Sequence, residues 1–307
     1  MTMKASQLEI LPKIEKAKNE KKARFLTLIL LMVTVVPSFV FWVAARLREK
    51  KISFPKPSVE IKVPRPLSVK LSHWVAEAIT PLPGKWAVRV ELLTDDSVWG
   101  INDQDQFVAA SLIKLPVVAA FYHQVEQGKL SLEETYVLKE EDKVAGAGSL
   151  QYRPAGTELT LGQLASLALS QSDNTAFKIL RRKVGDQEIN RLIAQWGMTK
   201  TDLEENLTSA ADIALFFRRL YQGEIVNQEF KQRMLNDLTE TIFEDRIPAG
   251  VPEGIKVAHK VGTETGVISD AGIIFTPNNP FILVILSQET DEAVAKAVSY
   301  THLTLPT

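Results

Sequence analysis

The sequence predicts an α/β domain of two subdomains, in which helices flank an antiparallel sheet that is built from both ends of the domain. Three observations predict it. Strand-like runs occur near residues 86–101 and again over 255–287, helical periodicity fills much of the chain between them, and a long uncharged segment precedes the domain. Since a sheet must be covered by other elements, one sheet with an inserted all-helical region is the simplest arrangement.

The uncharged segment over residues 25–45 is long enough to cross a bilayer as a helix. A cleaved signal peptide would have a shorter apolar core and small residues at its cleavage site, so we expect an uncleaved anchor. Basic residues flank the segment on both sides, and the positive-inside rule therefore discriminates weakly. We assign residues 1–24 to a basic cytoplasmic segment, 25–45 to a transmembrane helix, and the proline-rich residues 46–66 to a stiff linker.

The elements of the folded domain, over residues 67–297, follow from their periodicity. We expect helices over 67–80, 161–168 and 209–221, the last ending at Gly223, and a hairpin of strands over 86–93 and 97–101. Three further strands are expected over 255–262, 267–275 and 281–287, with the sequence TPNNP as the turn between the last two.

Composition narrows the possible functions. The chain has 307 residues, of which 45% are hydrophobic and 24% charged, and its net charge of −1 offers no basic excess for a nucleic-acid partner. It contains no cysteine, which excludes thiol catalysis, disulfides and cysteine-ligated metals. His73, His123 and His259 lack ligand spacing, so we expect neither a metal nor a cofactor.

The stretch ASLIKLP places Ser111 three residues before Lys114, where an apolar, helix-like run begins. One helical turn would bring the two side chains together, and a buried lysine can lose its proton and act as a base. The alternative is a helix-capping serine followed by a surface lysine. Ser53 and Lys56 have the same spacing in the linker, where no helix aligns them, so the spacing alone does not decide.

Two further motifs bear on that choice. Ser172, Asp173 and Asn174 directly follow an apolar helix, and Lys260 stands at the end of an expected strand in HKVGTETG. Taken alone, Ser172 could be a helix cap or a turn residue, and Lys260 a solvated strand end. In this order, however, Ser-x-x-Lys, Ser-Asp-Asn and Lys-Thr-Gly are the joint signature of class A β-lactamases and penicillin-binding proteins, and the chain resembles this family over about residues 67–297.

The resemblance implies catalytic roles for four residues. Ser111 would attack the carbonyl of a β-lactam or a D-alanyl amide, and Lys114 would accept or relay its proton. Ser172 would pass a proton to the leaving nitrogen. Lys260 would supply a fixed positive charge beside Ser172 and the substrate carboxylate.

The resemblance also implies a substrate-binding set. Asn174 would hold both Lys114 and the side-chain amide of the substrate. The backbone N–H groups of Ser111 and Thr263 would form the oxyanion hole. Val261, Gly262 and Thr263 would line the strand beside the substrate, but Val261 stands where the family has threonine or serine, so recognition of an acidic substrate should be weaker.

A second departure concerns the omega loop, in which class A enzymes carry a glutamate that positions the deacylating water. Here the sequence passes from Thr199 to the next helix with almost nothing between, and only Glu204 and Glu205 are nearby. We expect both to be solvated, so acylation should give a burst followed by slow turnover. The glycine-rich residues 146–151 lack the features of a phosphate loop and are expected to form a flexible rim of the cleft.

These observations predict a membrane-anchored serine hydrolase or acyltransferase with its domain outside the cytoplasm. Its partners would be a β-lactam or a D-Ala-D-Ala-type peptide and the membrane. A DD-peptidase acting on peptidoglycan and a catalytically silent relative that binds peptidoglycan or a partner are the alternatives, and the oligomeric state is left open. Residues 298–307, VSYTHLTLPT, match a translated sequencing adapter and are expected to be a non-native tail.

Overall fold

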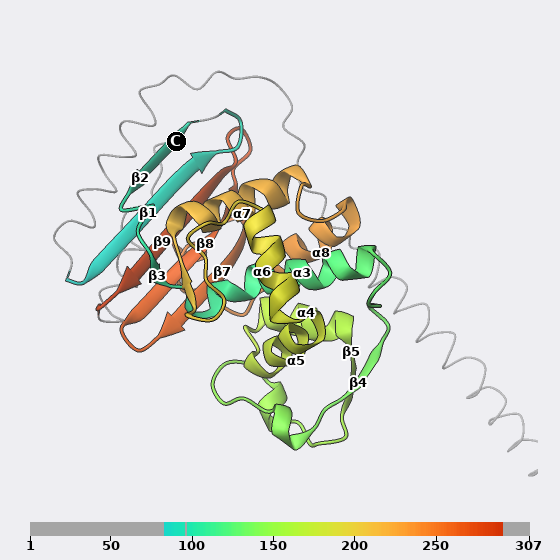
Figure 1. The fold of residues 1–307 in the computed structure, drawn as a ribbon. Coiled ribbons are helices and arrows are strands. Elements are labelled where there is room, and N and C mark those ends of the chain that lie inside the picture. Colours follow the sequence, from blue (N-terminus) through green and yellow to red (C-terminus); the bar gives the residue numbers. More distant parts are fainter. Residues whose placement is uncertain (1–82, 96, 291–307) are drawn as a thin grey trace, which may run out of the picture. The chain divides into compact units, whose positions relative to one another are not determined.

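The computed structural model describes residues 83–95 and 97–290 (Figure 1). Several sequence predictions lie outside these residues: the basic segment, the transmembrane helix and linker, the helix over 67–80, the Ser53–Lys56 pair, His73 and the tail over 298–307. Within the described part of the chain, no helix combines the length and the apolar character that a bilayer crossing requires.

The main sheet joins the two ends of the described domain. Its five strands have the order β2-β1-β9-β8-β7 and are antiparallel throughout. The strands are β1 (Lys85–Leu92), β2 (Val98–Ile101), β7 (Lys256–Glu264), β8 (Val267–Phe275) and β9 (Phe281–Gln288). β1 pairs with β9 along its whole length, so the first and last strands lie side by side, as Figure 1 shows. The predicted hairpin and the three predicted C-terminal strands are confirmed.

Both faces of this sheet carry apolar side chains. In β9, Ile282, Val284 and Leu286 belong to the large core that the sheet shares with the helices. The alternate residues Phe281, Leu283 and Ile285 belong to a second apolar cluster on the opposite face. This period of two follows from the pleat of a strand, and burial of both faces explains why the strand is almost continuously hydrophobic.

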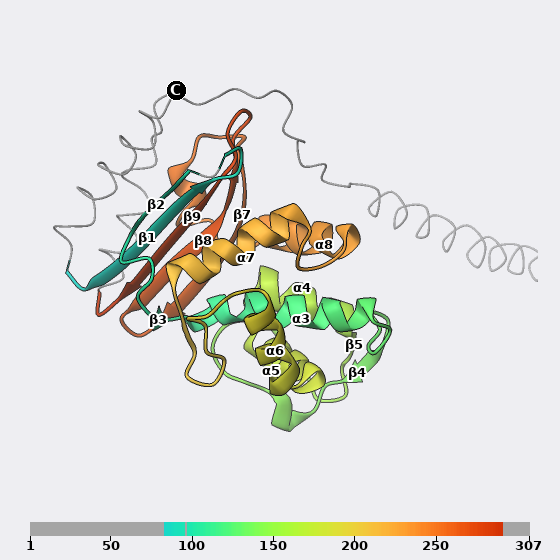
Figure 2. The same cartoon turned by 45° about the horizontal axis from the view of Figure 1, so that its top comes forward.

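The helices form two groups. They are α3 (Lys114–Glu126), α4 (Leu161–Ser170), α5 (Asn174–Val184), α6 (Asp186–Gln195), α7 (Ala210–Gln222) and α8 (Gln228–Thr239). α7 contacts β1 and β9, and α8 contacts β7, whereas α4, α5 and α6 pack against α3 (Figure 2). α3 therefore connects the sheet half of the domain to the helical half.

A capping residue at each end determines where α7 begins and ends, as the sequence predicts. The hydroxyl of Ser209 accepts a hydrogen bond from the N–H of Asp212 at 3.1 Å and caps α7. Gly223 ends the same helix in the left-handed conformation with a φ of 78°, which glycine adopts without steric cost.

The inserted region is mainly helical rather than all-helical. It contains a two-stranded sheet of β4 (Thr135–Val137) and β5 (Glu158–Thr160). A second small sheet pairs β3 (Phe107–Val108) with β6 (Leu207–Thr208). The sequence did not indicate these strands because two or three residues are too few to display an alternating pattern.

Candidate active site

Ser111 lies in a short 3-10 helix, η2 (Ala110–Ile113), immediately before α3. The entry to η2 is fixed by the N–H of Ala109, which donates to the carbonyl oxygen of Asn206 at 2.8 Å. Ala110 has a φ of 46°, in the left-handed region that residues with a side chain adopt uncommonly. Such backbone strain clusters at functional sites, and here it turns the chain sharply just before Ser111.

The alternative of a capping serine followed by a surface lysine is wrong. The N-cap position of α3 is Ile113, and neither η2 nor α3 has a side-chain cap. Lys114 is the first residue of α3 and is only 2% exposed. Ser111 lies in a 3-10 turn rather than in the first turn of the α-helix, but residues three apart are eclipsed in such a turn, so it still faces the same side as Lys114.

The ammonium group of Lys114 is surrounded by oxygen acceptors. Its Nζ donates to Asn174 Oδ1 at 2.7 Å, to Ser172 Oγ at 3.2 Å and to the carbonyl oxygen of Ser172. Burial lowers the pKa of Lys114 to about 7, against the opposing effect of the Asp173 charge. A lysine with this pKa can give up and take a proton near neutral pH, as a general base must.

Asp173, to which no role was given from the sequence, holds the turn that carries Ser172 and Asn174. Its Oδ1 accepts from the N–H of Ala176 at 2.9 Å and so caps α5, while its Oδ2 accepts from the N–H of Leu150 at 2.8 Å. Ser172, buried and with a φ of 55°, therefore stands before the helix cap and is not itself the cap.

The glycine-rich residues 146–151 pack directly on this turn. A Cβ at Gly148 would collide with Asp173, and one at Gly146 would come within 2.8 Å of Asn174 Nδ2. Only glycine permits this close approach, and both positions also have positive φ. The segment thus borders the site, at the place where the sequence predicts a rim.

Lys260 lies in the middle of β7 rather than at its end, and it is 1% exposed, so the alternative of a solvated strand end is wrong. Its Nζ donates to the carbonyl oxygen of Val261 at 3.2 Å and lies 5.7 Å from the ring centre of Phe243. Burial lowers the pKa of Lys260 well below its usual value, and the positive charge of Lys114 lowers it further. The two lysines therefore interact electrostatically across the site.

Arg246, which no sequence motif marks, joins this part of the site. It is 5% exposed, and it donates from Nη2 to Thr263 Oγ1 at 2.6 Å and from Nη1 to the carbonyl oxygen of Ser269 at 2.6 Å. Val261 and Thr263 share one side of β7 because side chains alternate along a strand. A hydroxyl is absent at Val261, but the hydroxyl of Thr263 two residues later is held by a guanidinium group.

His259 forms a buried pair with Asp270. Side chains alternate along a strand, so His259 faces the same side of β7 as Val261 and Thr263. His259 Nδ1 lies 2.8 Å from Asp270 Oδ1, and Asp270 Oδ2 accepts from the N–H of Ile247 at 3.0 Å. This buried pair anchors the loop that carries Arg246 to the sheet.

β7 packs directly against the turn that carries Ser111. A Cβ at Gly262 would lie 3.0 Å from the carbonyl oxygen of Ala109, so a side chain there would press the strand away from η2. β7 is also an edge strand of the described sheet, which leaves one row of its backbone groups without a neighbouring strand. The role of the Ser111 and Thr263 N–H groups as an oxyanion hole stays a prediction.

The short segment before β6 exposes its two glutamate side chains to solvent. The N–H groups of Glu204 and Glu205 donate to Asp202 Oδ1 at 2.8 and 2.9 Å, and both glutamate side chains are exposed. In the described part of the chain, no hydrogen bond joins either carboxylate to Ser111 or Lys114. Nor do the described residues contain a group of three or more potential metal ligands.

The arrangement of these residues agrees with what comparisons with known proteins find. A family model described as "Beta-lactamase enzyme family" matches residues 69–301. The extended-spectrum beta-lactamase PER-1 of Pseudomonas aeruginosa is 25% identical over 245 residues, which cover 67% of this chain and 80% of that protein.

Solved structures show the same similarity. A beta-lactamase from Sphaerobacter thermophilus superposes with a TM-score of 0.72 at 30% identity, covering 76% of this chain and 94% of the other. A point variant of PBP-A, solved as an acyl-enzyme complex with penicillin G, gives a TM-score of 0.70 at 26% identity, covering 75% of this chain and 94% of the other.

Proposed function

Because the chain belongs to the beta-lactamase enzyme family and is a serine hydrolase of the class A type, we propose that it forms an acyl-enzyme on Ser111 with β-lactams and releases it slowly. One observation carries the proposal. Lys114 is buried three residues after Ser111 in the chain, burial lowers its pKa to about 7, and its Nζ contacts the hydroxyl of Ser172 and the amide of Asn174.

We propose an acylation route that uses these contacts. Neutral Lys114 takes the proton of the Ser111 hydroxyl as its oxygen attacks the carbonyl carbon of the lactam. The new C–O bond forms, and the carbonyl oxygen becomes an oxyanion that backbone N–H groups at Ser111 and Thr263 would stabilise. The C–N bond then breaks while the proton passes from Lys114 through the Ser172 hydroxyl, 3.2 Å away, to the leaving nitrogen.

We assign the recognition of a carboxylate on the acyl donor to Arg246 and Lys260, the cations on the β7 side of the site. Arg246 and Lys260 are both buried, and Asp270 is the acidic residue whose charge acts on Lys260. An anion would offset the repulsion between Lys260 and Arg246, since buried charges require partners. The Thr263 hydroxyl accepts a hydrogen bond from Arg246. We assign to it the contact with the carboxylate of the acyl donor that the apolar side chain of Val261 cannot make.

Slow deacylation is proposed from the position of the nearby carboxylates. Hydrolysis of the ester needs a base that orients water on it. Glu204 and Glu205 are exposed, their N–H groups donate to Asp202, and the Glu204 charge acts on Arg181. The enzyme should therefore consume one equivalent of β-lactam in a burst, with the opened lactam held on the enzyme, and turn over slowly afterwards.

A D-Ala-D-Ala-type peptide is the second candidate donor. Such a peptide presents a terminal carboxylate next to the amide that is cleaved, and the buried cations on the β7 side suit that carboxylate as they suit that of a penicillin. A DD-peptidase acting on peptidoglycan would use the same proton transfers. The two activities differ in which acyl donor is turned over.

We also propose that residues 25–45 anchor the chain in the membrane with residues 67–297 outside the cytoplasm. The proposal rests on the uncharged sequence of that segment. Peptidoglycan and β-lactams would meet the enzyme on that side of the membrane.

Intact-mass measurement after incubation with benzylpenicillin tests the proposed function. The wild-type chain should gain the mass of the whole penicillin, whereas Ser111→Ala should gain nothing and keep its thermal unfolding midpoint. Ser53→Ala, which removes the serine with the same lysine spacing in the linker, should react like wild type. A wild-type chain that neither forms an adduct nor consumes benzylpenicillin would favour the catalytically silent alternative, and an adduct on Ser111→Ala would exclude Ser111 as the nucleophile.

A further inference from the structure

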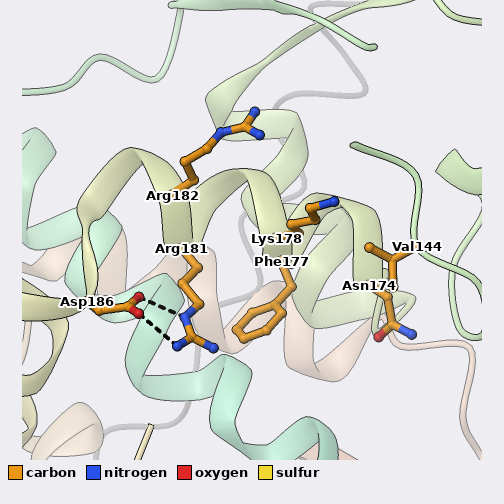
Figure 3. Close-up of a pocket in the computed structure, with 7 residues that line it drawn as sticks. All are labelled: Val144, Asn174, Phe177, Lys178, Arg181, Arg182 and Asp186. Atoms are coloured by element: carbon orange, nitrogen blue, oxygen red, sulfur yellow. Dashed lines mark hydrogen bonds and ion pairs between the residues drawn. The ribbon is translucent and has the colours of Figure 1, made fainter. Parts of the chain in front are cut away.

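A groove of about 580 Å³ runs along α5 from the catalytic cluster. Its lining includes Asn174, which binds Lys114, and continues over Phe177, Lys178 and Arg181 of the same helix. Residues at these spacings share one helix face, and Figure 3 shows Phe177 and Arg181 pointing to the same side of α5. The volume lies in the range of sites that bind small molecules.

Phe177 connects this groove to the reacting groups. Its ring centre lies 5.7 Å from Lys114 Nζ, and the side chain packs against the hydrophobic core while it also lines the groove. A substrate whose side-chain amide is held at Asn174 would therefore extend over an apolar surface at Phe177 before it reaches the next turn of the helix.

The cations on this face differ in their partners. Arg181 pairs with Asp186 through two hydrogen bonds of 2.7 and 2.8 Å and also interacts electrostatically with Glu204, and Arg182 donates to Asp142 at 2.9 Å. Lys178, by contrast, donates to the carbonyl oxygen of Glu141 at 2.7 Å, a neutral acceptor that leaves its charge uncompensated. Lys178 is exposed, so this charge is accessible to a ligand in the groove.

We infer that the groove binds an acidic group on the acyl side chain of the donor, with Lys178 as its ionic partner. The donors of this enzyme are then acyl groups of acidic peptide character, in which a carboxylate follows the side-chain amide after a short apolar spacer. Asn174 and Lys178 are one turn apart, about 6 Å along the helix axis, which fixes the length of that spacer. This inference rests on the proposed acyl transfer at Ser111.

Two penicillins of equal length test it. One carries an adipoyl side chain, whose terminal carboxylate is separated from the amide by four methylene groups, and the other is its methyl ester at that terminus. The second-order rate constant of acylation is measured for both by quenched-flow mass spectrometry. The wild-type chain should react with the carboxylate about three to five times faster than with the ester at low ionic strength, as expected of an exposed ion pair.

Two variants test whether the preference for the carboxylate over the ester arises in the groove. Lys178→Gln should bring the ratio of the two rate constants to about one, whereas Lys183→Gln, which removes a cation of the same helix that pairs with Glu134, should leave the ratio unchanged. The ratio does not depend on the folded fraction, because both donors react with the same active molecules. Raising the ionic strength from about 0.01 M to about 1 M shortens the Debye length to about 3 Å and should also reduce the ratio.

The outcomes separate the two proposals. Equal rate constants in the wild-type chain, or a preference that persists in Lys178→Gln, would refute the acidic-donor groove and leave acyl transfer intact. The absence of any adduct with benzylpenicillin would refute the proposed function, and with it this inference.

Discussion

Lys114 and Lys260 are both almost completely buried, yet their surroundings differ. Lys114 donates to three oxygen atoms, two of Ser172 and one of Asn174. Lys260 has one hydrogen bond to a backbone carbonyl and an aromatic ring near its ammonium group. Among the described residues, its charged surroundings are two cations, Lys114 and Arg246, and a single anion, Asp270.

The difference indicates separate tasks for two residues of the same type. The partners of Lys114 are hydroxyl and amide groups that can exchange or orient a proton, and its pKa is lowered to about 7. The region of Lys260 contains an excess of buried positive charge, which is costly without an anion. The helical side of the site is thus built for proton transfer and the β7 side for binding a negative group, and the following predictions test this contrast.

The largest effect is expected for Lys114→Met, which keeps the length of the side chain and removes the base. The acylation rate constant with benzylpenicillin should fall by about 10²- to 10⁴-fold, the usual contribution of a general base. Stopped-flow kinetics measures it, and circular dichroism checks the fold. Lys183→Met, on the neighbouring helix, is the matched control and should keep the wild-type rate constant.

The pH profile sharpens this prediction. Below pH 7 Lys114 is mostly protonated and cannot take the proton of Ser111, so the acylation rate constant should fall about tenfold per pH unit. Above this pH the neutral amine predominates and the rate constant should level off. A profile without this rise, or the same rise in Lys114→Met, would exclude Lys114 as the base.

A smaller effect is expected for Arg246→Met on the β7 side. Loss of one charge-assisted hydrogen bond to the donor carboxylate should lower the acylation rate constant for benzylpenicillin about 10- to 100-fold. The methyl ester of the same penicillin lacks that charge and should lose much less. Equal losses for acid and ester would indicate that Arg246 only supports the fold, which the thermal unfolding midpoint would reveal independently.

The smallest effect is expected for Glu204→Gln and Glu205→Gln. Both carboxylates are exposed and make no contact with the catalytic cluster within the described residues, so the deacylation rate constant should stay within about twofold of wild type. Release of the acyl group followed by mass spectrometry measures it. A large slowing in either variant would show that this short segment does position the hydrolytic water.

Much of the fold could be predicted because its signals are local. Short runs rich in apolar and β-branched residues identify β1, β7, β8 and β9, and the caps at Ser209 and Gly223 set the ends of α7. The two small sheets were missed because their strands are too short to display a period. The ends of the chain, including the predicted membrane helix, lie outside the described residues.

For the candidate site, the sequence by itself determined the reacting groups, since Ser111, Lys114, Ser172 and Lys260 occur in ordered motifs. Only the tertiary structure decided their surroundings. The pKa of Lys114 depends on how completely the fold removes water from it, and Arg246 reaches Thr263 from a loop 17 residues away in the chain. Desolvation and summed charge depend on which segments meet in space, and no spacing within one segment encodes them.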